Sequence, residues 1–149
     1  MDRLAVSLKD ILAGRPKIIA RSRTGKCFKG YLRDGRFLSR GRLRMTTLEG
    51  EELPVDLSQL KGVFFVRDFK GNENYLETKV LMTEPEQPGL RVRLRFEDNE
   101  TMEGVVENQL ELLASSGFFF WPADPEANNS LIFVVTSALL GFRVLSVKG

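Results

Sequence analysis

Three arginines at alternate positions, Arg40, Arg42 and Arg44, are the residues of this sequence whose type and spacing point most directly to chemistry. Alternate residues of a β-strand share one face, so the three guanidinium groups are expected to form a stripe. Guanidinium groups bind phosphate oxygens through paired hydrogen bonds. The stripe therefore predicts a site for a phosphate-bearing ligand such as RNA or a nucleotide.

The stripe belongs to a wider basic segment. Residues 15–44 contain 11 lysines and arginines and a single acid, Asp34. The candidate anion-binding residues in this segment are Arg21, Arg23, Lys26, Lys29, Arg40, Arg42 and Arg44. No aromatic residues accompany the stripe in the manner of a base-stacking platform. We therefore favour a solvated outer face that pairs with acidic residues elsewhere, with an anion site as the alternative.

The net charge of +2 conceals a division between the two halves of the chain. Residues 1–66 contain 14 Lys and Arg against 7 Asp and Glu, whereas residues 67–149 contain 8 against 13. Such asymmetry indicates either that the halves attract one another, in one chain or between chains, or that the basic half meets an anionic partner.

Histidine is absent from the sequence, which excludes histidine-based nucleophile triads and histidine metal ligands. The remaining titratable residues form no catalytic motif, so we expect no enzyme, no metal and no cofactor. The single Cys27 cannot form an internal disulfide, and its neighbour Phe28 favours an ordinary packed or rim thiol over a reactive one. Neither a secretory signal nor an apolar run of about 20 residues is present. This predicts a cytoplasmic protein without membrane contact.

A recurring segment sets the organisation of the chain. Residues 16–30 return as residues 90–104 with a shift of 74 positions. The shift pairs Ile18 with Val92, Ala20 with Leu94, Arg21 with Arg95 and Gly30 with Gly104. Residues 55–66 return as residues 134–145 with a shift of 79, which adds five residues to the second copy. We infer an internal duplication, which predicts two small units.

Hydrophobic periodicity predicts the elements of the first unit. Apolar residues of positions 1–13 recur at helical spacing and predict a short N-terminal helix, ended by Gly14 and Pro16. From residue 17 the period changes to two and predicts strands, the third of them over residues 36–47. One helical turn over residues 58–61, started by Ser58, is expected before the last strand.

The second unit is expected to repeat this order of strands. Its residues 91–96 alternate, with three arginines pointing outward, and residues 109–114 are expected to be hairpin material. Four consecutive aromatic residues then make both faces of one strand apolar. These residues, Phe118, Phe119, Phe120 and Trp121, are expected to be buried between the two units or in a homodimer.

These elements describe a small SH3-like barrel in each half. The pattern Gly25-x-x-Phe28-x-Gly30-x-Leu32 resembles the first signature of the Sm-like RNA-binding fold. The whole chain is similar to an uncharacterised bacterial family of tandem small barrels, through residues 60–69 and 117–138. These resemblances imply an all-β protein of two tandem SH3-like or Sm-like small barrels with a short N-terminal α-helix. The expected domains are residues 1–66 and 90–149, joined by a linker over residues 67–89.

A further resemblance concerns cyclic dinucleotides. Arg40 and Arg44 have the Arg-x-x-x-Arg spacing of PilZ domains, and residues 56–62 resemble the later Asp-x-Ser-x-x-Gly motif with one residue more. The resemblance implies a receptor for cyclic di-GMP.

We expect a non-enzymatic binding or interaction module of a bacterial regulatory system. Its contact sites would be exposed sheet edges and the aromatic residues, and its partner a protein or a second copy. The alternative is an anion-binding module that holds RNA or a nucleotide through the arginine-rich first unit.

Overall fold

The computed structural model describes residues 12, 14–32, 38–39, 41–71, 75–82, 85 and 87–149. Within these residues the chain consists of antiparallel β-strands and short 3-10 helices, which confirms the expected all-β class. The expected N-terminal helix over residues 1–13 lies outside the described residues, apart from Leu12. Arg40 also lies outside them.

The first half contributes β1 (Lys17–Ser22), β2 (Cys27–Leu32), β3 (Leu38–Ser39), β4 (Arg42–Thr47), β5 (Glu52–Asp56), the 3-10 turn η1 (Leu57–Gln59) and β6 (Leu60–Val66). Alternation sets the faces, because Ile18 and Ala20 are fully buried while Arg21 is exposed. The expected strand over residues 36–47 is divided in two. Gly41 has a φ of 74°, a left-handed conformation that turns the chain between β3 and β4.

The second half contributes β7 (Gly89–Phe96), β8 (Thr101–Val106), η2 (Leu110–Leu113), β9 (Gly117–Pro122), β10 (Asn129–Val135), η3 (Thr136–Ala138) and β11 (Leu139–Lys148). The hairpin expected over residues 109–114 is wrong, because this stretch is the 3-10 helix η2. The hydroxyl of Ser115 donates to the carbonyls of Leu112 and Gly117 and closes the turn after it. Such local bonds compete with strand pairing.

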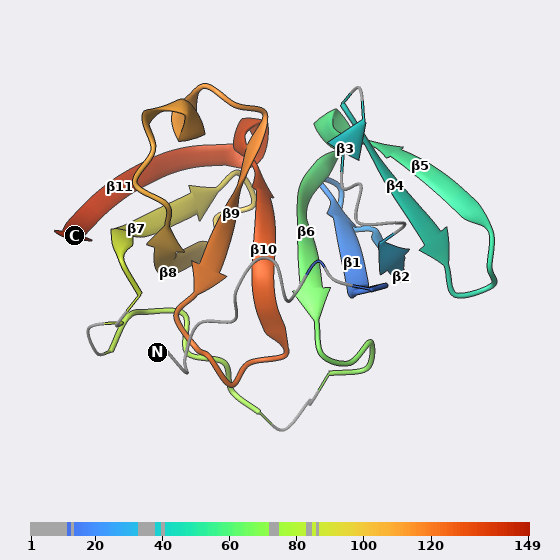
Figure 1. Ribbon diagram of the computed structural model, residues 1–149, viewed down its shortest axis with the longest axis horizontal. Helices are drawn as coiled ribbons and strands as arrows, with labels where there is room; N and C mark the ends of the chain where they lie inside the picture. Colours follow the sequence, from blue (N-terminus) through green and yellow to red (C-terminus); the bar gives the residue numbers. More distant parts are fainter. Residues whose placement is uncertain are drawn as a thin grey trace.

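The strands follow the order β11-β7-β8-β9-β10-β6-β1-β2-β4-β3, and β5 pairs with the other edge of β4 (Figure 1). Among the described strands this is one continuous antiparallel path that does not close, so two separate closed barrels are not observed. The reason is the pairing of β6 with β10, which joins the halves edge to edge.

Two clusters of buried apolar side chains lie along this sheet, and each contains residues of both halves. Ile18, Leu43 and Phe65 belong to the first cluster, and Val92 and Leu94 belong to the second. Strands β9 and β10 contribute to both clusters, because successive side chains of a strand point to opposite faces. The two halves therefore share their interior at the joint.

Several described residues of the segment expected to be a linker, residues 67–89, contact the second half. The guanidinium of Arg67 donates to the carbonyls of Pro125 and Ala127 at 2.8 and 2.7 Å, and the Tyr75 hydroxyl donates to Asp124 at 2.6 Å. This last bond raises the pKa of Tyr75 to about 12. Polar contacts therefore hold the segment, whereas Leu76 remains 89% exposed.

The same segment corrects the outward placement expected for Arg91. This side chain is only 1% exposed and donates to the carbonyls of Pro85 and Gly89. The backbone around Pro85 accepts its guanidinium, and a buried guanidinium requires such acceptors. Alternation alone placed Arg91 in solvent because it could not include this covering segment.

Candidate interaction surface

The joint between the halves is the pairing of β6 with β10. Val63 lies opposite Phe133, and Phe64 lies opposite Ile132. All seven residues of β6 are buried, because its apolar side chains pack in the first cluster on one face and in the second cluster on the other, while β1 and β10 pair with its two edges. A Cβ added at Gly62 would lie 2.9 Å from the Phe133 carbonyl oxygen, so the backbones approach closely there. At this joint the edge of β6, a strand of the first half, is covered by β10, a strand of the second half.

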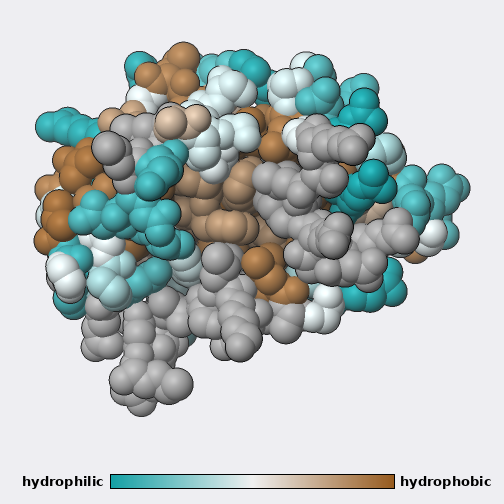
Figure 2. All heavy atoms as spheres, turned by 45° about the horizontal axis from the view of Figure 1, so that its top comes forward, coloured by the Kyte–Doolittle hydropathy of each residue, from teal (hydrophilic) through white to brown (hydrophobic). Residues whose placement is uncertain are grey.

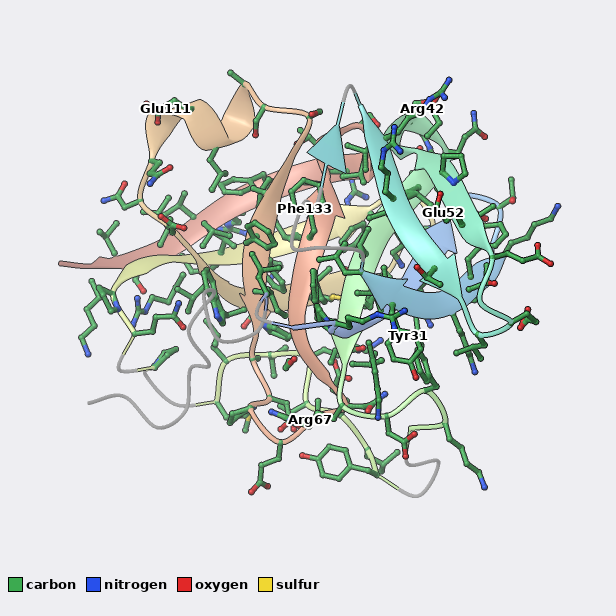
Figure 3. The ribbon with its side chains drawn as sticks, turned by 45° about the vertical axis from the view of Figure 1, so that its right-hand side comes forward. Tyr31, Arg42, Glu52, Arg67, Glu111 and Phe133 are labelled. Carbon is green, nitrogen blue, oxygen red and sulfur yellow. The ribbon has the colours of Figure 1, made fainter. Side chains whose placement is uncertain are left out.

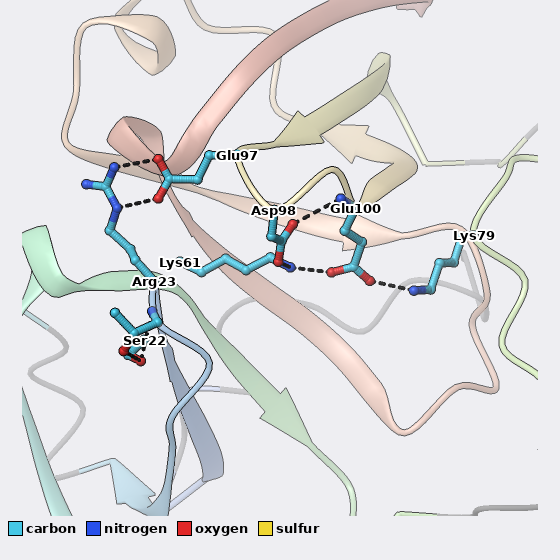
Figure 4. Close-up of polar contacts among 8 residues, drawn as sticks. Ser22, Arg23, Lys61, Lys79, Glu97, Asp98 and Glu100 are labelled. Atoms are coloured by element: carbon cyan, nitrogen blue, oxygen red, sulfur yellow. Dashed lines mark hydrogen bonds and ion pairs between the residues drawn. The ribbon is translucent and has the colours of Figure 1, made fainter.

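Charged side chains clasp one end of the joint (Figure 4). Arg23 of the first half binds the Glu97 carboxylate through two hydrogen bonds of 2.5 and 2.6 Å. The Nζ of Lys61 donates to Asp98 at 2.7 Å and to Glu100. We define these side chains, together with Lys79, as the ionic clasp, whose members are Arg23, Lys61, Lys79, Glu97, Asp98 and Glu100. The clasp is the attraction between halves that the charge asymmetry predicts.

The clasp lowers the pKa of its carboxylates. The hydrogen bond from Arg23 lowers the pKa of Glu97, and the hydrogen bond from Lys61 lowers the pKa of Asp98. Burial alone would raise the pKa of Glu100, but hydrogen bonds from Lys61 and Lys79 outweigh it and leave the pKa below its ordinary value. All three groups are therefore charged near neutral pH.

Four of the seven predicted anion-binding residues lie on β1, β2 and the turn between them. Arg23 is engaged by the clasp, and the Arg21 guanidinium lies 4.9 Å from the centre of the Phe64 ring. Lys26 and Lys29 are exposed. The four residues therefore do not form a single basic site.

The arginine stripe is described only in part. Arg42 and Arg44 are exposed on β4, and both lie at a shallow depression of about 150 Å³. Its lining consists of Arg42, Arg44, Met45, Glu52, Leu53 and Pro54. Figure 3 shows Arg42 and Glu52 on the outer strands, far from Phe133 at the joint. An acid thus shares the depression with the two arginines, which reduces its attraction for an anion.

The residues that resemble the PilZ motif have a local structural role. The Asp56 carboxylate accepts hydrogen bonds from the backbone N–H and the hydroxyl of Ser58, at 3.0 and 2.9 Å. Asp56 therefore caps η1, rather than Ser58 as the sequence suggested. The backbone bond, followed by the hydroxyl bond, lowers the pKa of Asp56.

The four aromatic residues of β9 lie at the joint. Phe118 and Phe120 are 6% and 0% exposed and pack in the second cluster, and Trp121 is 8% exposed and packs in the first. Phe119 contacts Phe133 edge to face, with ring centres 5.2 Å apart. The alternation expected for this stretch is thus present, and its side chains face the interior of this chain.

The surface that sequence reasoning did not single out is the edge strand β11. We define the apolar edge as its exposed large hydrophobic residues, Leu140, Val144, Leu145 and Val147. Their exposed fractions are 56%, 48%, 38% and 59%. Figure 2 shows hydrophobic atoms at the surface on the left, the end at which β11 finishes in Figure 1. The sequence does contain a sign of this edge. Apolar residues of β11 occur at both odd and even positions, so both faces of the strand are apolar.

Among the described strands, β11 pairs only with β7, at one end of the sheet order. Its other edge carries ten residues of backbone with no described strand beside it. A long apolar edge strand is a template for another strand, and proteins usually protect such edges.

Residues 14–146 match the model of a family of unknown function, DUF6982. The chain belongs to the DUF6982 family. No curated protein and no solved structure matches it. The resemblance to an uncharacterised family is confirmed at this level.

The DUF6982 match includes every strand from β1 to β10 and β11 as far as Ser146. Both clusters, the joint and most of the apolar edge therefore lie within the family region. None of the described helices has the length or the apolar composition needed to cross a membrane. Membership of DUF6982 supplies no activity, so a role has to be argued from the surfaces themselves.

Proposed function

We propose that this protein is a non-enzymatic interaction module of a bacterial regulatory system, acting in the cytoplasm, which binds a protein partner through β11. The observation that carries the proposal is the apolar edge, where three residues of one open edge strand, Leu140, Val144 and Val147, are each about half exposed or more. Burial of such a patch on association is favourable because apolar surface leaves water.

Strand addition is the mode of binding that this edge supports. An added strand gains backbone hydrogen bonds along β11, and its side chains gain apolar contacts with the apolar edge. The pairing of β6 with β10 is the same kind of contact within the chain, where it leaves β6 wholly buried.

We also propose that the two halves are tandem copies of one small SH3-like or Sm-like unit. Support comes from the strand registers. Ile18 lies opposite Gly30 in the first half, and Val92 lies opposite Gly104 in the second, which matches the shift of 74. An added Cβ at Gly30 or Gly104 would lie 2.1 or 2.3 Å from a carbonyl oxygen of the next strand, so both glycines serve the same close approach.

The proposal is tested by retention of proteins on the immobilised chain in high salt. We expect a protein that binds the wild type to be lost from the variant V144E/V147E, because carboxylates on the apolar edge oppose desolvation. The control variant K26E/K29E changes two exposed residues, one directly before β2 and one on it, and should retain the bound protein. Equal retention by V144E/V147E and the wild type would refute the role of β11.

A second candidate is an anion-binding module for RNA or a nucleotide. It is supported by Arg42 and Arg44, which share the depression on the outer face of β4. Retention on heparin that decreases in an Arg40, Arg42 and Arg44 triple alanine variant would favour it, since each phosphate contact adds to the salt dependence of binding. Calorimetry with cyclic di-GMP tests the PilZ-like version, and absence of heat would eliminate it.

A further inference from the structure

Strands β6 and β11 hold corresponding places in the two halves. Strand β6 follows η1 and pairs with β1, and β11 follows η3 and pairs with β7. The registers agree with the shifts of the sequence repeat, because Phe65 lies opposite Ile18 and Val144 lies opposite Val92. The difference lies on the second edge, where β6 meets β10 and β11 meets no described strand.

Strands β5 and β10 also correspond. Each precedes a 3-10 turn and pairs with the strand before it in the sheet, β4 for β5 and β9 for β10. The second edge of β10 receives β6, whereas no described strand lies beside the second edge of β5. Each chain thus contains one joint, formed by β6 and β10. It also contains the strands that correspond to them, β11 and β5, each with one edge beside which no described strand lies.

We propose that β11 of one copy pairs antiparallel with β5 of a second copy, in the manner in which β6 pairs with β10 inside the chain. The inference rests on the proposed interaction role and names a second copy of this chain as the partner. The contact joins two different surfaces, so successive copies form a closed ring or an open chain.

Burial favours this contact. Phe65 and Val66 of β6 lie opposite Leu131 and Asn129 of β10, and a shift of 79 places Val144 and Leu145 at the same positions of β11. Both residues belong to the apolar edge. A second strand would therefore lie beside them as β10 lies beside Phe65 and Val66, and it would remove apolar surface from water.

Charge selects β5 as the partner strand. Residues 49–56 contain four acids and no base, whereas β11 contains two bases, Arg143 and Lys148, and no acid. Two β11 strands would bring bases together, and two β5 strands would bring acids together. Segments of opposite net charge attract one another, and segments of like charge repel. Head-to-tail pairing is the arrangement that avoids both repulsions.

The joint also predicts the register. Phe133 opposite Val63 corresponds to Pro54 opposite Phe142, and Leu131 opposite Phe65 corresponds to Glu52 opposite Val144. Pro54 has no N–H, so the contact between copies makes fewer backbone bonds than the joint does. We therefore expect an association that depends on protein concentration.

The experiment is sedimentation velocity of the full chain over a series of concentrations into the high micromolar range. We expect the mass of the wild type to rise above that of a monomer. The variants R143E/V144E and E51K/E52K place like charges on the two strands. The affinity of each variant for itself should be lower than that of the wild type by a factor of about ten or more. Mixed in equal amounts, the two variants should regain association, because each mixed contact is complementary. The variant K26E/K29E should behave as the wild type.

Three results would overturn the proposal. They are a wild type that stays monomeric, a variant R143E/V144E or E51K/E52K that associates alone as the wild type does, and a mixture of the two folded variants that does not associate. Trp121 fluorescence and circular dichroism establish that each variant is folded. If one is not, hydrogen exchange of the wild type decides the question. Protection must increase with concentration at residues 52–56 and 139–148 together, and an increase at only one of them refutes the pairing.

Failure of this inference is distinguishable from failure of the proposed function. If the wild type is monomeric but retains a protein that V144E/V147E does not retain, β11 remains a docking edge for another protein. A self-associating wild type whose mass is unchanged in R143E/V144E would remove β11 from the contact between copies, and retention by V144E/V147E would then decide separately whether β11 binds another protein.

Discussion

The Nζ of Lys61 lies 4.7 Å from the centre of the Phe96 ring, so a lysine of the first half rests against an aromatic residue of the second. Its side chain is only 8% exposed and ends between the carboxylates of Asp98 and Glu100. A cation over a ring and between two acids is stabilised by both. Lys61 is therefore the most enclosed member of the ionic clasp.

Replacing Lys61 with alanine should destabilise the protein. The change leaves Glu100, whose side chain is 18% exposed, with one cation instead of two. We expect the free energy of unfolding to decrease by about 2 kcal/mol, less than for a fully buried pair because Asp98 reaches solvent. Urea unfolding followed by Trp121 fluorescence measures it. The exposed Lys26→Ala is the matched control and should change stability by less than about 0.5 kcal/mol. Equal effects of the two changes would contradict a special role for Lys61.

Acid should weaken the clasp. The pKa values of Asp98 and Glu100 are lower in the folded protein than their ordinary values, so their contribution is present above the unfolded pKa values. It is lost as the pH falls through the folded values, and we expect stability to decline from about pH 5 downward. Glu77, whose pKa is raised by burial, contributes in the opposite sense. Urea midpoints across this range measure the slope, which should be smaller in Lys61→Ala. An identical slope in both proteins would show that the clasp does not cause it.

The two halves should unfold together. Trp121 is a residue of the second half that packs in the first cluster, and Phe133 and Leu131 do the same. Neither half can lose its structure without exposing side chains of the other. We expect the transitions seen by Trp121 fluorescence and far-ultraviolet circular dichroism to coincide. Separate transitions would indicate that the joint is too weak to couple the halves.

The strands could be predicted from sequence because most have one buried face. Val92, Leu94 and Phe96 alternate with exposed or half-exposed residues, and the period of two is visible. The joint could not be predicted. Strand β6 is apolar on both faces, which indicates a strand covered on both sides but does not identify the strand beside it. Its partner β10 lies in the other half, beyond the reach of local patterns.

Of the candidate site, the sequence predicted only that the two halves carry opposite net charges. Opposite charges of the halves predicted an attraction, and Arg23 and Glu97 provide it across 74 residues. No local rule pairs residues so far apart, and the sequence alone therefore predicts Arg23 to be a ligand-binding arginine. The apolar edge was missed because exposure depends on which strands have a second neighbour, a property of the whole sheet.

Gly30 and Gly104 should not tolerate alanine. A Cβ at Gly104 would lie 2.3 Å from the Trp121 carbonyl oxygen and 2.5 Å from the Phe120 ring. A Cβ at Gly30 would lie 2.1 Å from the Thr46 carbonyl oxygen. Both strands would have to separate, and we expect a loss of about 3 kcal/mol in the free energy of unfolding for each variant.

Gly141 is the matched control for these two glycines. It also lies within a strand, but the nearest atom to an added Cβ is the Arg95 Cβ at 3.6 Å, an ordinary contact. Gly141→Ala should therefore change the free energy of unfolding by less than about 0.5 kcal/mol. Urea unfolding of the three variants provides the comparison. If Gly30→Ala were as stable as Gly141→Ala, β2 and β4 would not approach as closely as the structure describes, and the agreement between Gly30 and Gly104 would no longer support a duplicated unit.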